Sequence, residues 1–302
     1  MSDGARMPGD ALIAETIAQA RADGPLGILS GSGVAPTAIA DLVVKHGRPV
    51  VLFGFRGFAD PAAIERFPHE WIALGQFGRF KRLARQHRCR DFIWVGGLVR
   101  PRISQLRFDF GTILMLPDLF RAYRGGDNHM LTTLGRFFER YGFRVMAIRD
   151  VAPQLLAPEG AMTSRSPSPQ DRADIERGLD LIATISRFDI GQAALVAENH
   201  VLAVEGVEGT DEMLRHTADL RRAGRIRSKE KTGVLVKVAK QGQDLRFDLP
   251  TIGPDTIANV AAAGLGGIAI AAGKTIIVDI DRVIAEADRA GLFVVSVETR
   301  DR

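Results

Sequence analysis

The chain has 302 residues, of which 46% are hydrophobic and 7% aromatic. This length is long for a single hydrophobic core and comfortable for two domains. Cys89 is the one cysteine, so an internal disulfide and a thiolate zinc site are both excluded. A lone cysteine suits a reducing compartment, and we expect a cytoplasmic protein.

The first 25 residues do not have the pattern of a signal peptide. Asp3, Asp10, Glu15 and Asp23 stand where a signal peptide needs an apolar core. We therefore expect an N-terminal extension over residues 1–25. Elsewhere no apolar run approaches the ~20 residues that a membrane-spanning helix needs.

The chain is basic, with a formal net charge of +4 and a pI near 9.5. Cations are concentrated between Arg215 and Lys231. A solvated helix and loop is the better interpretation of this stretch, and an anionic membrane surface or a phosphorylated ligand is the functional alternative. Nucleic acid is disfavoured because no aromatic residue is interleaved with these charges.

Strands and helices alternate through the first half of the chain. Apolar runs predict buried strands, and apolar residues at helical spacing predict the helices between them. This alternation indicates an α/β fold with a Rossmann-like parallel sheet in the N-terminal domain. The predicted strands are Leu26–Ser30, Val50–Phe55, Trp71–Leu74, Phe92–Val95 and Phe143–Ala147, and the predicted helices are 36–46, 77–87 and 131–141.

Prolines and serines between Asp150 and Gln170 predict a connector. We therefore place an N-terminal domain at residues 26–151 and a C-terminal mixed α/β domain at 152–302. Ser168 and Pro169 begin a helix in this second domain. The other predicted elements are a hairpin of 194–197 and 201–204, strands 233–238 and 245–249, helix 255–263, a second hairpin of 267–271 and 274–279, helix 283–290 and strand 292–297.

A glycine-rich loop, GILSGSGVAP, joins the first predicted strand to the first helix. Glycines at this place let the backbone approach a phosphate at the helix N-terminus. The dinucleotide fingerprint needs a third glycine, where Pro36 stands, and an acid after the second strand, where Arg56 stands. NAD is therefore disfavoured, whereas Arg56 keeps an NADP-dependent reductase open as an alternative. Gly96, Gly97 and Arg100 are expected on the same rim.

The segment Gly126–His129 is similar to the GNH element of two-metal phosphoesterases. Those sites also need a DxH motif on an early strand, and no DxH precedes this segment in the sequence. A helix N-terminus capped by Asp127 or Asn128 is the stronger interpretation.

Acids and glycines gather in two segments of the second domain, DIGQ at 189–192 and AVEGVEGTD at 203–211. Such residues at a strand-to-helix junction can hold Mg²⁺ through carboxylates and a phosphate through backbone N–H groups. Capping of a helix over 212–220 by Thr210 or Asp211 explains the pattern equally well, and the sequence leaves both interpretations open.

The segment Lys237–Gly253, KVAKQGQDLRFDLPTIG, mixes basic and acidic side chains densely. If 245–249 is a strand, alternation places Asp244, Arg246 and Asp248 on one face. Cations that neutralise phosphate oxygens beside a carboxylate that holds a metal suit a phosphate–metal site. A ladder of surface salt bridges is the alternative, and the specificity of QDLRFDLPTIGP favours the site.

Together, GILSGSGVAP, DIGQ, AVEGVEGTD and KVAKQGQDLRFDLPTIG resemble the LpxI family of UDP-2,3-diacylglucosamine pyrophosphatases. The resemblance implies two domains and a homodimer. It also implies hydrolysis of the UDP-2,3-diacylglucosamine pyrophosphate to UMP and 2,3-diacylglucosamine 1-phosphate. It further implies a divalent metal, typically Mg²⁺ or another cation such as Mn²⁺, with water attacking the β-phosphorus. We expect peripheral contact with the cytoplasmic face of the inner membrane.

The match to the family's RxDLPTIG motif places its essential aspartate at Asp248, as metal ligand and catalytic residue. Glu205 and Asp211 are further candidate metal ligands. Ser32 stands where the family's glycine triplet has its second glycine, and Gly97 stands where the family has Asn. The expected substrate-binding residues are Gly31, Gly33, Gly97, Gln192, Thr210, Lys237, Lys240, Gln243, Arg246 and Thr251. A non-catalytic sensor of nucleotides or acidic lipids shares these residues and remains an alternative.

Overall fold

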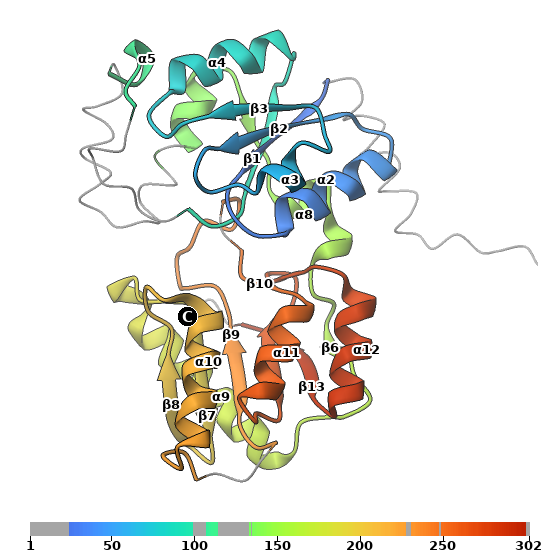
Figure 1. Cartoon of the computed structure of the whole chain (residues 1–302), viewed down its shortest axis with the longest axis vertical. Coiled ribbons are helices and arrows are strands. Elements are labelled where there is room, and N and C mark those ends of the chain that lie inside the picture. The colour runs from blue at the N-terminus through green and yellow to red at the C-terminus, as the bar shows by residue number, and fades with distance from the viewer. Residues whose placement is uncertain are drawn as a thin grey trace, which may run out of the picture. The chain divides into compact units, whose positions relative to one another are not determined.

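A computed structural model describes residues 24–98, 107–113, 133, 135–227, 231–247 and 249–299 (Figure 1). The chain divides into two compact units. The N-terminal unit comprises Met1–Pro153 with Arg246–Asp248, and the C-terminal unit comprises Gln154–Leu245 with Leu249–Arg302. The predicted extension at 1–25, apart from its last two residues, and the Gly126–His129 segment lie outside the described residues.

The N-terminal unit contains a five-stranded parallel sheet in the order β3-β2-β1-β4-β5. Its order reverses direction between β1 and β4, which is the topology of doubly wound folds. The predicted Rossmann-like parallel sheet is therefore confirmed. The strands are β1 (Leu26–Ser30), β2 (Val50–Phe55), β3 (His69–Ile72), β4 (Asp91–Val95) and β5 (Arg144–Val145).

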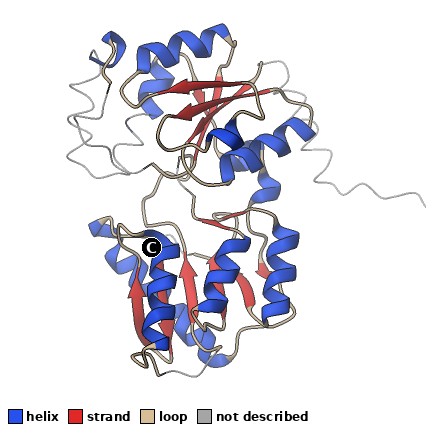
Figure 2. Cartoon of the chain, viewed as in Figure 1, coloured by secondary structure: helices blue, strands red, loops and turns tan. Residues whose placement is uncertain are grey.

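Helices cover this sheet, as the colouring by secondary structure shows (Figure 2). One face carries a core of aromatic rings in edge-to-face and tilted contact, in which Phe53, Phe80 and Phe92 lie with centroids 5.1–5.6 Å apart. Phe137 and Phe138 join it from the helical residues 135–140. The other described helices of this unit are α2 (Ala35–Lys45), α3 (Pro61–Ile64), α4 (Phe77–Gln86), α5 (Phe110–Ile113) and α8 (Ile148–Val151).

A buried charge cluster lies at the amino ends of β1 and β4. Asp91 is 1% exposed and accepts hydrogen bonds from Arg48 at 2.6 Å and from Arg144 at 2.7 and 2.9 Å. Burial raises the pKa of Asp91, but the hydrogen bonds from Arg144 and Arg48 outweigh it and hold the pKa below its usual value. Arg48 also donates to the carbonyl of Gly24. These ends are opposite the edge at which ligands bind in such sheets, so we assign the cluster to stability.

The C-terminal unit contains a six-stranded mixed sheet in the order β6-β13-β11-β9-β7-β8, which confirms the predicted mixed α/β fold. The three central strands β13, β11 and β9 are parallel, and β6, β7 and β8 are antiparallel to their inner neighbours. The strands are β6 (Gly160–Ala161), β7 (Ala193–Ala197), β8 (His200–Val204), β9 (Val234–Lys237), β11 (Gly267–Ala271) and β13 (Phe293–Val297).

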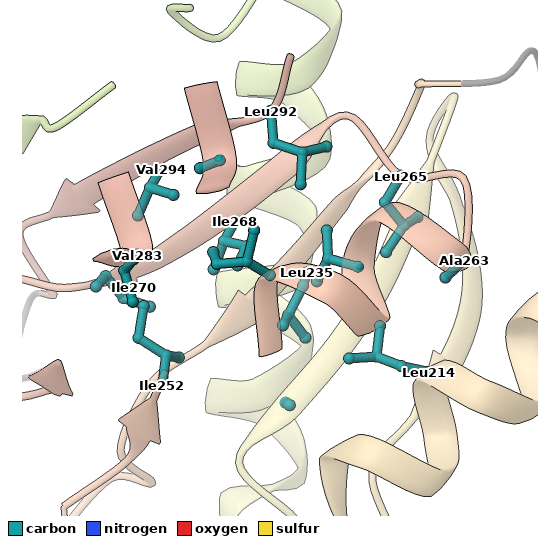
Figure 3. Packing of buried hydrophobic residues seen from close by; sticks show 14 of the residues in the cluster. Leu214, Leu235, Ile252, Ala263, Leu265, Ile268, Ile270, Val283, Leu292 and Val294 are labelled. Atoms are coloured by element: carbon teal, nitrogen blue, oxygen red, sulfur yellow. The ribbon is translucent and has the colours of Figure 1, made fainter. Parts of the chain in front are cut away.

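Helices cover both faces of this sheet. On one face, α10 (Gly209–Arg222), α11 (Pro254–Ala262) and α12 (Ile280–Ala290) lie side by side (Figure 1). Between them and the sheet, Leu214, Leu235, Ile268, Val283 and Val294 form an aliphatic core (Figure 3). Alternate residues of the same strands face α9 (Pro169–Ile185), which begins at the predicted N-cap Ser168. Two 3₁₀ turns, Pro153–Leu155 and Ser186–Phe188, complete the described helical elements.

The second predicted hairpin is wrong. Lys274–Asp279 does not pair back onto β11, because its only strand residues, β12 (Ile276–Ile277), pair in parallel with β10 (Thr251–Ile252). Instead, Thr275 is buried, and its hydroxyl accepts a hydrogen bond from the N–H of Ala271. The apolar residues of 274–279 correctly predict a buried segment, but they do not indicate that it pairs with β10 instead of β11.

The predicted strand at 245–249 is also wrong. Residues 245–247 form a turn, so Asp244 and Arg246 do not share a strand face. Phe247 is 6% exposed and packs in the aromatic core of the N-terminal unit, with its ring centroid 6.4 Å from that of Trp94. The alternation of apolar and polar residues in this segment therefore does not indicate a strand, and Phe247 is apolar because its side chain packs in a core.

Candidate functional site

In the N-terminal unit, the loop after β1 meets the loop after β4. Ser32 and Gly97 exchange backbone hydrogen bonds of 2.9 and 3.1 Å, and the Ser32 hydroxyl donates to the Gly97 carbonyl at 3.0 Å. A Cβ at Gly31 would come within 2.5 Å of the Gly97 carbonyl, so this approach requires glycine. The structure thus brings Gly31, Gly33 and Gly97 together, as the sequence predicts.

The helix α2 begins directly after this loop. Val34 is its N-cap and provides no side-chain hydrogen bond, and Gly33 has a positive φ of 92°. Ser32, Gly33 and Val34 are exposed. Uncapped N–H groups at the point where strand order reverses can receive an anion such as a phosphate.

In the C-terminal unit, Glu205 organises the edge where β8 ends. It is 7% exposed, and both its oxygens accept hydrogen bonds: Oε2 from the Gln192 N–H and Oε1 from the Thr210 hydroxyl, each at 2.8 Å. Its own N–H donates to the Ala193 carbonyl at 2.9 Å. Glu205 therefore joins the start of β7, the end of β8 and the first turn of α10.

The backbones of the two segments 189–192 and 203–211 pack closely against each other. Gly191 lies so near Glu205 that a Cβ would come within 2.2 Å of the Glu205 carbonyl oxygen. Of the two interpretations left open, a side-chain cap from Thr210 or Asp211 is wrong, because α10 begins at Gly209 with Glu208 as its N-cap, and the Glu208 carboxylate accepts from the Gly206 N–H at 3.0 Å instead of capping the helix. The Thr210 hydroxyl is turned to Glu205 instead, which leaves the first N–H groups of α10 without a side-chain cap.

Next to Gln192, the segment after β9 carries the predicted lysine and glutamine. The Val238 N–H donates to the Gln192 carbonyl at 3.0 Å, which places the end of β9 against the start of β7. Lys240 forms an ion pair with Asp189, and the Lys240 N–H donates to Gln243 Oε1 at 2.8 Å. Lys237, the last residue of β9, is 8% exposed. The structure thus gathers four predicted residues, Gln192, Lys237, Lys240 and Gln243, at one edge of this sheet.

The remaining predicted residues occupy other places. Asp211 is exposed on α10 and accepts a hydrogen bond of 3.0 Å from Asn259 on α11. Thr251 lies in β10, and its hydroxyl donates to the Leu249 carbonyl at 3.3 Å. Arg246 belongs to the N-terminal unit, where it forms an ion pair of 3.1 Å with Glu139. Asp248 lies outside the described residues and remains a prediction.

A divalent metal at this site would need ligand atoms from the substrate in addition to those of the protein. Among the residues that the structure describes, no three His, Cys, Asp or Glu side chains form a group that could hold a metal ion. Mg²⁺ is commonly bound through one or two carboxylates together with waters and substrate phosphates. Glu205 can supply one carboxylate through its remaining lone pairs, so the donor set fits a metal shared with phosphates.

Sequence reasoning missed two features of this edge. Asp189 adopts a left-handed conformation with φ of 58° and pairs with Lys240 across 51 positions in the sequence. Glu205 acts as a double acceptor that positions its neighbours. The DIGQ and VEGT segments signalled that these residues matter, but no sequence pattern indicates which hydrogen bonds a carboxylate accepts.

The structure is that of a two-domain α/β protein with a glycine-lined loop edge in the N-terminal unit and a polar edge in the C-terminal unit. Residues 25–155 match the LpxI N-terminal domain and residues 158–295 match the LpxI C-terminal domain. The chain is also 40% identical over 277 residues to the UDP-2,3-diacylglucosamine pyrophosphatase LpxI of Caulobacter vibrioides, which covers 92% of this chain and 99% of that protein. The chain therefore belongs to the LpxI family.

Proposed function

We propose that this protein is an enzyme of lipid A biosynthesis that hydrolyses UDP-2,3-diacylglucosamine to UMP and 2,3-diacylglucosamine 1-phosphate. The observation that carries the proposal is the 40% identity to a pyrophosphatase of that substrate across 99% of its length. Both units match their family domains, so the similarity is not confined to a nucleotide-binding half.

The proposed reaction is attack of water on the β-phosphorus. The water oxygen forms a bond to this phosphorus, and the bond from the β-phosphorus to the bridging oxygen breaks. The bridging oxygen leaves with UMP and takes the bonding electron pair, and the protons of the water are released. Negative charge grows on the bridging oxygen, so cations and N–H donors aimed at it lower the barrier.

The proposed residue roles rest on the resemblance to the family motifs, and the structure gathers four of these residues at one edge of the C-terminal sheet. Lys237, Lys240, Gln243 and Arg246 neutralise or donate to phosphate oxygens, with Gln192 and Thr251 as further substrate contacts. A bound Mg²⁺ or Mn²⁺ supplies a positive charge to the pyrophosphate oxygens, with Asp248 as its principal ligand. Glu205 and Asp211 are secondary metal ligands in this proposal.

The glycine loop of the N-terminal unit has a separate proposed role. Gly31, Gly33 and Gly97 allow backbone approach on the nucleotide side, and the uncapped start of α2 provides N–H donors. Thr210 lies at the equally uncapped start of α10. We also propose that the enzyme acts as a homodimer in the cytoplasm, in peripheral contact with the inner membrane. Among the helices described, none combines the length and apolarity needed to cross a membrane.

The test is incubation of the purified protein with UDP-2,3-diacylglucosamine, with and without EDTA, with detection of UMP. Asp248→Ala is expected to reduce UMP release by roughly 10²–10³-fold or more, the loss typical when a group that stabilises developing charge is removed. The matched control is Asp244→Ala, four positions away, for which we expect most of the activity to remain. Wild-type turnover in Asp248→Ala, or turnover unaffected by EDTA, contradicts the corresponding part of the proposal.

The alternatives give different results in the same experiment. A non-catalytic sensor binds the substrate but releases no UMP at any metal concentration. An NADP-dependent reductase enhances the fluorescence of added NADPH, and Arg56→Ala abolishes the enhancement. The family assignment favours neither result.

A further inference from the structure

An exposed apolar cluster lies on the N-terminal unit beside the start of α4. Phe110 is 77% exposed, Ile113 is 49% exposed and Phe108 is 40% exposed. All three belong to the short segment 107–113, which includes α5, next to α4 in Figure 1. Single exposed apolar residues need no explanation, but three within six positions form a patch that favours contact with another apolar phase.

This segment is fixed to the rest of the unit by hydrogen bonds. The Asp109 carboxylate accepts from the N–H groups of Gly78 at 3.1 Å and Arg79 at 2.7 Å, in the first turn of α4. The Thr112 hydroxyl accepts from the Phe77 N–H at 2.9 Å. Because Asp109 and Thr112 point into α4, Phe108, Phe110 and Ile113 are held outward.

The adjacent helix is basic. No Asp or Glu occurs from Trp71 to Arg90, whereas Arg79, Arg82 and Arg85 recur at three-residue spacing along one side of α4. None of these three arginines forms an ion pair with a carboxylate in the described part of the chain. The apolar cluster and this arginine row together form what we call the α4–α5 surface.

We propose that the α4–α5 surface docks the protein onto an anionic lipid bilayer. Apolar side chains that enter the headgroup boundary, flanked by cations that pair with lipid phosphates, are the two components of peripheral membrane binding. The surface supplies both and carries no competing acid apart from Asp109, which is engaged with α4. The inference deepens the proposed function, because a diacylated substrate is met at a membrane.

The α4–α5 surface differs from the basic stretch at Arg215–Lys231 in how its arginines are paired. On α10, Arg215 and Arg222 each pair with an acid of the same helix, Glu212 and Asp219. Their charges are therefore partly compensated, whereas those of Arg82 and Arg85 are not. The structure thus favours α4 over α10 as the membrane-facing helix, in contrast to the expectation from charge density along the sequence.

The experiment is co-sedimentation of the full chain with vesicles of phosphatidylcholine, alone or in an equimolar mixture with phosphatidylglycerol. The wild type is expected to bind the anionic vesicles and to be released by salt. Phe110→Ser should weaken binding about 10-fold through lost apolar burial. Its matched control, Phe188→Ser, removes a ring that is 62% exposed in the C-terminal unit and should leave binding unchanged.

A second pair of variants tests the charges. Replacing both Arg82 and Arg85 by Gln should weaken binding roughly 10- to 30-fold, because each cation near an anionic surface contributes about a fivefold factor. The same change at Arg215 and Arg222 should have little effect. Greater loss in the α10 pair, equal binding to neutral vesicles, or a wild type that does not bind vesicles overturns the proposal.

Two further measurements on the same variants separate this inference from the proposed function. UMP release from substrate dispersed in detergent micelles should be the same in Phe110→Ser and wild type, because the surface does no chemistry. If the wild type releases no UMP, the proposed function fails whatever the vesicles show. If sedimentation velocity shows that Phe110→Ser converts a dimer to a monomer, the surface is an interface between copies and the bilayer proposal is wrong.

Discussion

In the N-terminal unit, the core on one face of the sheet is a set of aromatic rings in mostly edge-to-face and tilted contact, whereas the largest described core cluster of the C-terminal unit contains no ring at all. Ring packing is directional, and each ring has few alternative positions. Aliphatic side chains over three parallel helices tolerate exchange more readily. The aromatic core also takes up Phe247 from the segment that carries Arg246 and Asp248. Packing in the N-terminal unit therefore holds Phe247, which is next in sequence to two residues that the proposed chemistry needs.

The largest effect is expected from Phe247→Ala. Loss of a buried ring costs about 3–5 kcal/mol of unfolding free energy. Because Arg246 and Asp248 flank the lost ring, UMP release should also fall when the protein is still folded. Both tryptophans, Trp71 and Trp94, lie in the N-terminal unit, so tryptophan fluorescence during thermal unfolding reports on this unit.

The matched variant in the other core is Ile268→Ala. It should cost about 2–5 kcal/mol, a loss of similar size. Activity measured below its unfolding temperature should stay near the wild-type value, since no site residue adjoins Ile268. Equal activity loss in Phe247→Ala and Ile268→Ala would break the proposed distinction between the two cores.

Asp91→Ala tests the buried charges of the N-terminal unit and is expected to cost about 3 kcal/mol, because it leaves Arg48 buried without its partner. The pKa of Asp91 is lowered in the folded protein, so its contribution is complete above the unfolded pKa of about 4 and is lost as the pH falls through the folded value. The fluorescence midpoint of the wild type should therefore fall on acidification below about pH 4. If the unfolding midpoint of Asp91→Ala falls just as steeply with decreasing pH, groups other than Asp91 cause the acid sensitivity.

A smaller effect on rate is expected from Glu205→Gln. The amide cannot accept at both positions, so when its oxygen accepts from the Gln192 N–H its NH2 group must donate to the Thr210 hydroxyl, which reverses that hydrogen bond and removes the carboxylate charge. We expect roughly a 10–100-fold loss of turnover, as for groups that orient ligands, with little change in unfolding temperature. Glu212→Gln, exposed on α10, is the control. Reduced metal affinity together with lost turnover supports the ligand role of Glu205, and a change in KM alone supports positioning of Gln192 and Thr210.

Much of the fold could be predicted from the sequence where apolar runs are long. Val50–Phe55 is buried at every position, and its strand has the predicted bounds. The predicted hairpin of β7 and β8 is confirmed, since Glu198 and Asn199 form a turn between two short apolar runs. Short segments could not be assigned, because β10 and β12 have two residues each and are stabilised by contacts distant in sequence.

The sequence allowed several residues of the candidate site to be predicted, but not the hydrogen bonds and ion pairs that they form. Motif resemblance identified Gln192, Lys240 and Gln243, which the structure brings to one edge. It could not reveal that Asp189 pairs with Lys240, or that Thr210 serves Glu205 rather than a helix cap, because both depend on side-chain positions. The packing of Phe247 in the aromatic core could not be predicted either, because an apolar residue between Arg246 and Asp248 is equally compatible with a β-strand.

The central claim is that water cleaves the pyrophosphate at the β-phosphorus, and hydrolysis in ¹⁸O-labelled water tests it most directly. After a single turnover of UDP-2,3-diacylglucosamine, mass spectrometry should find the label in 2,3-diacylglucosamine 1-phosphate and none in UMP. Label in UMP would place the attack on the α-phosphorus and contradict the account, and so would the absence of both products.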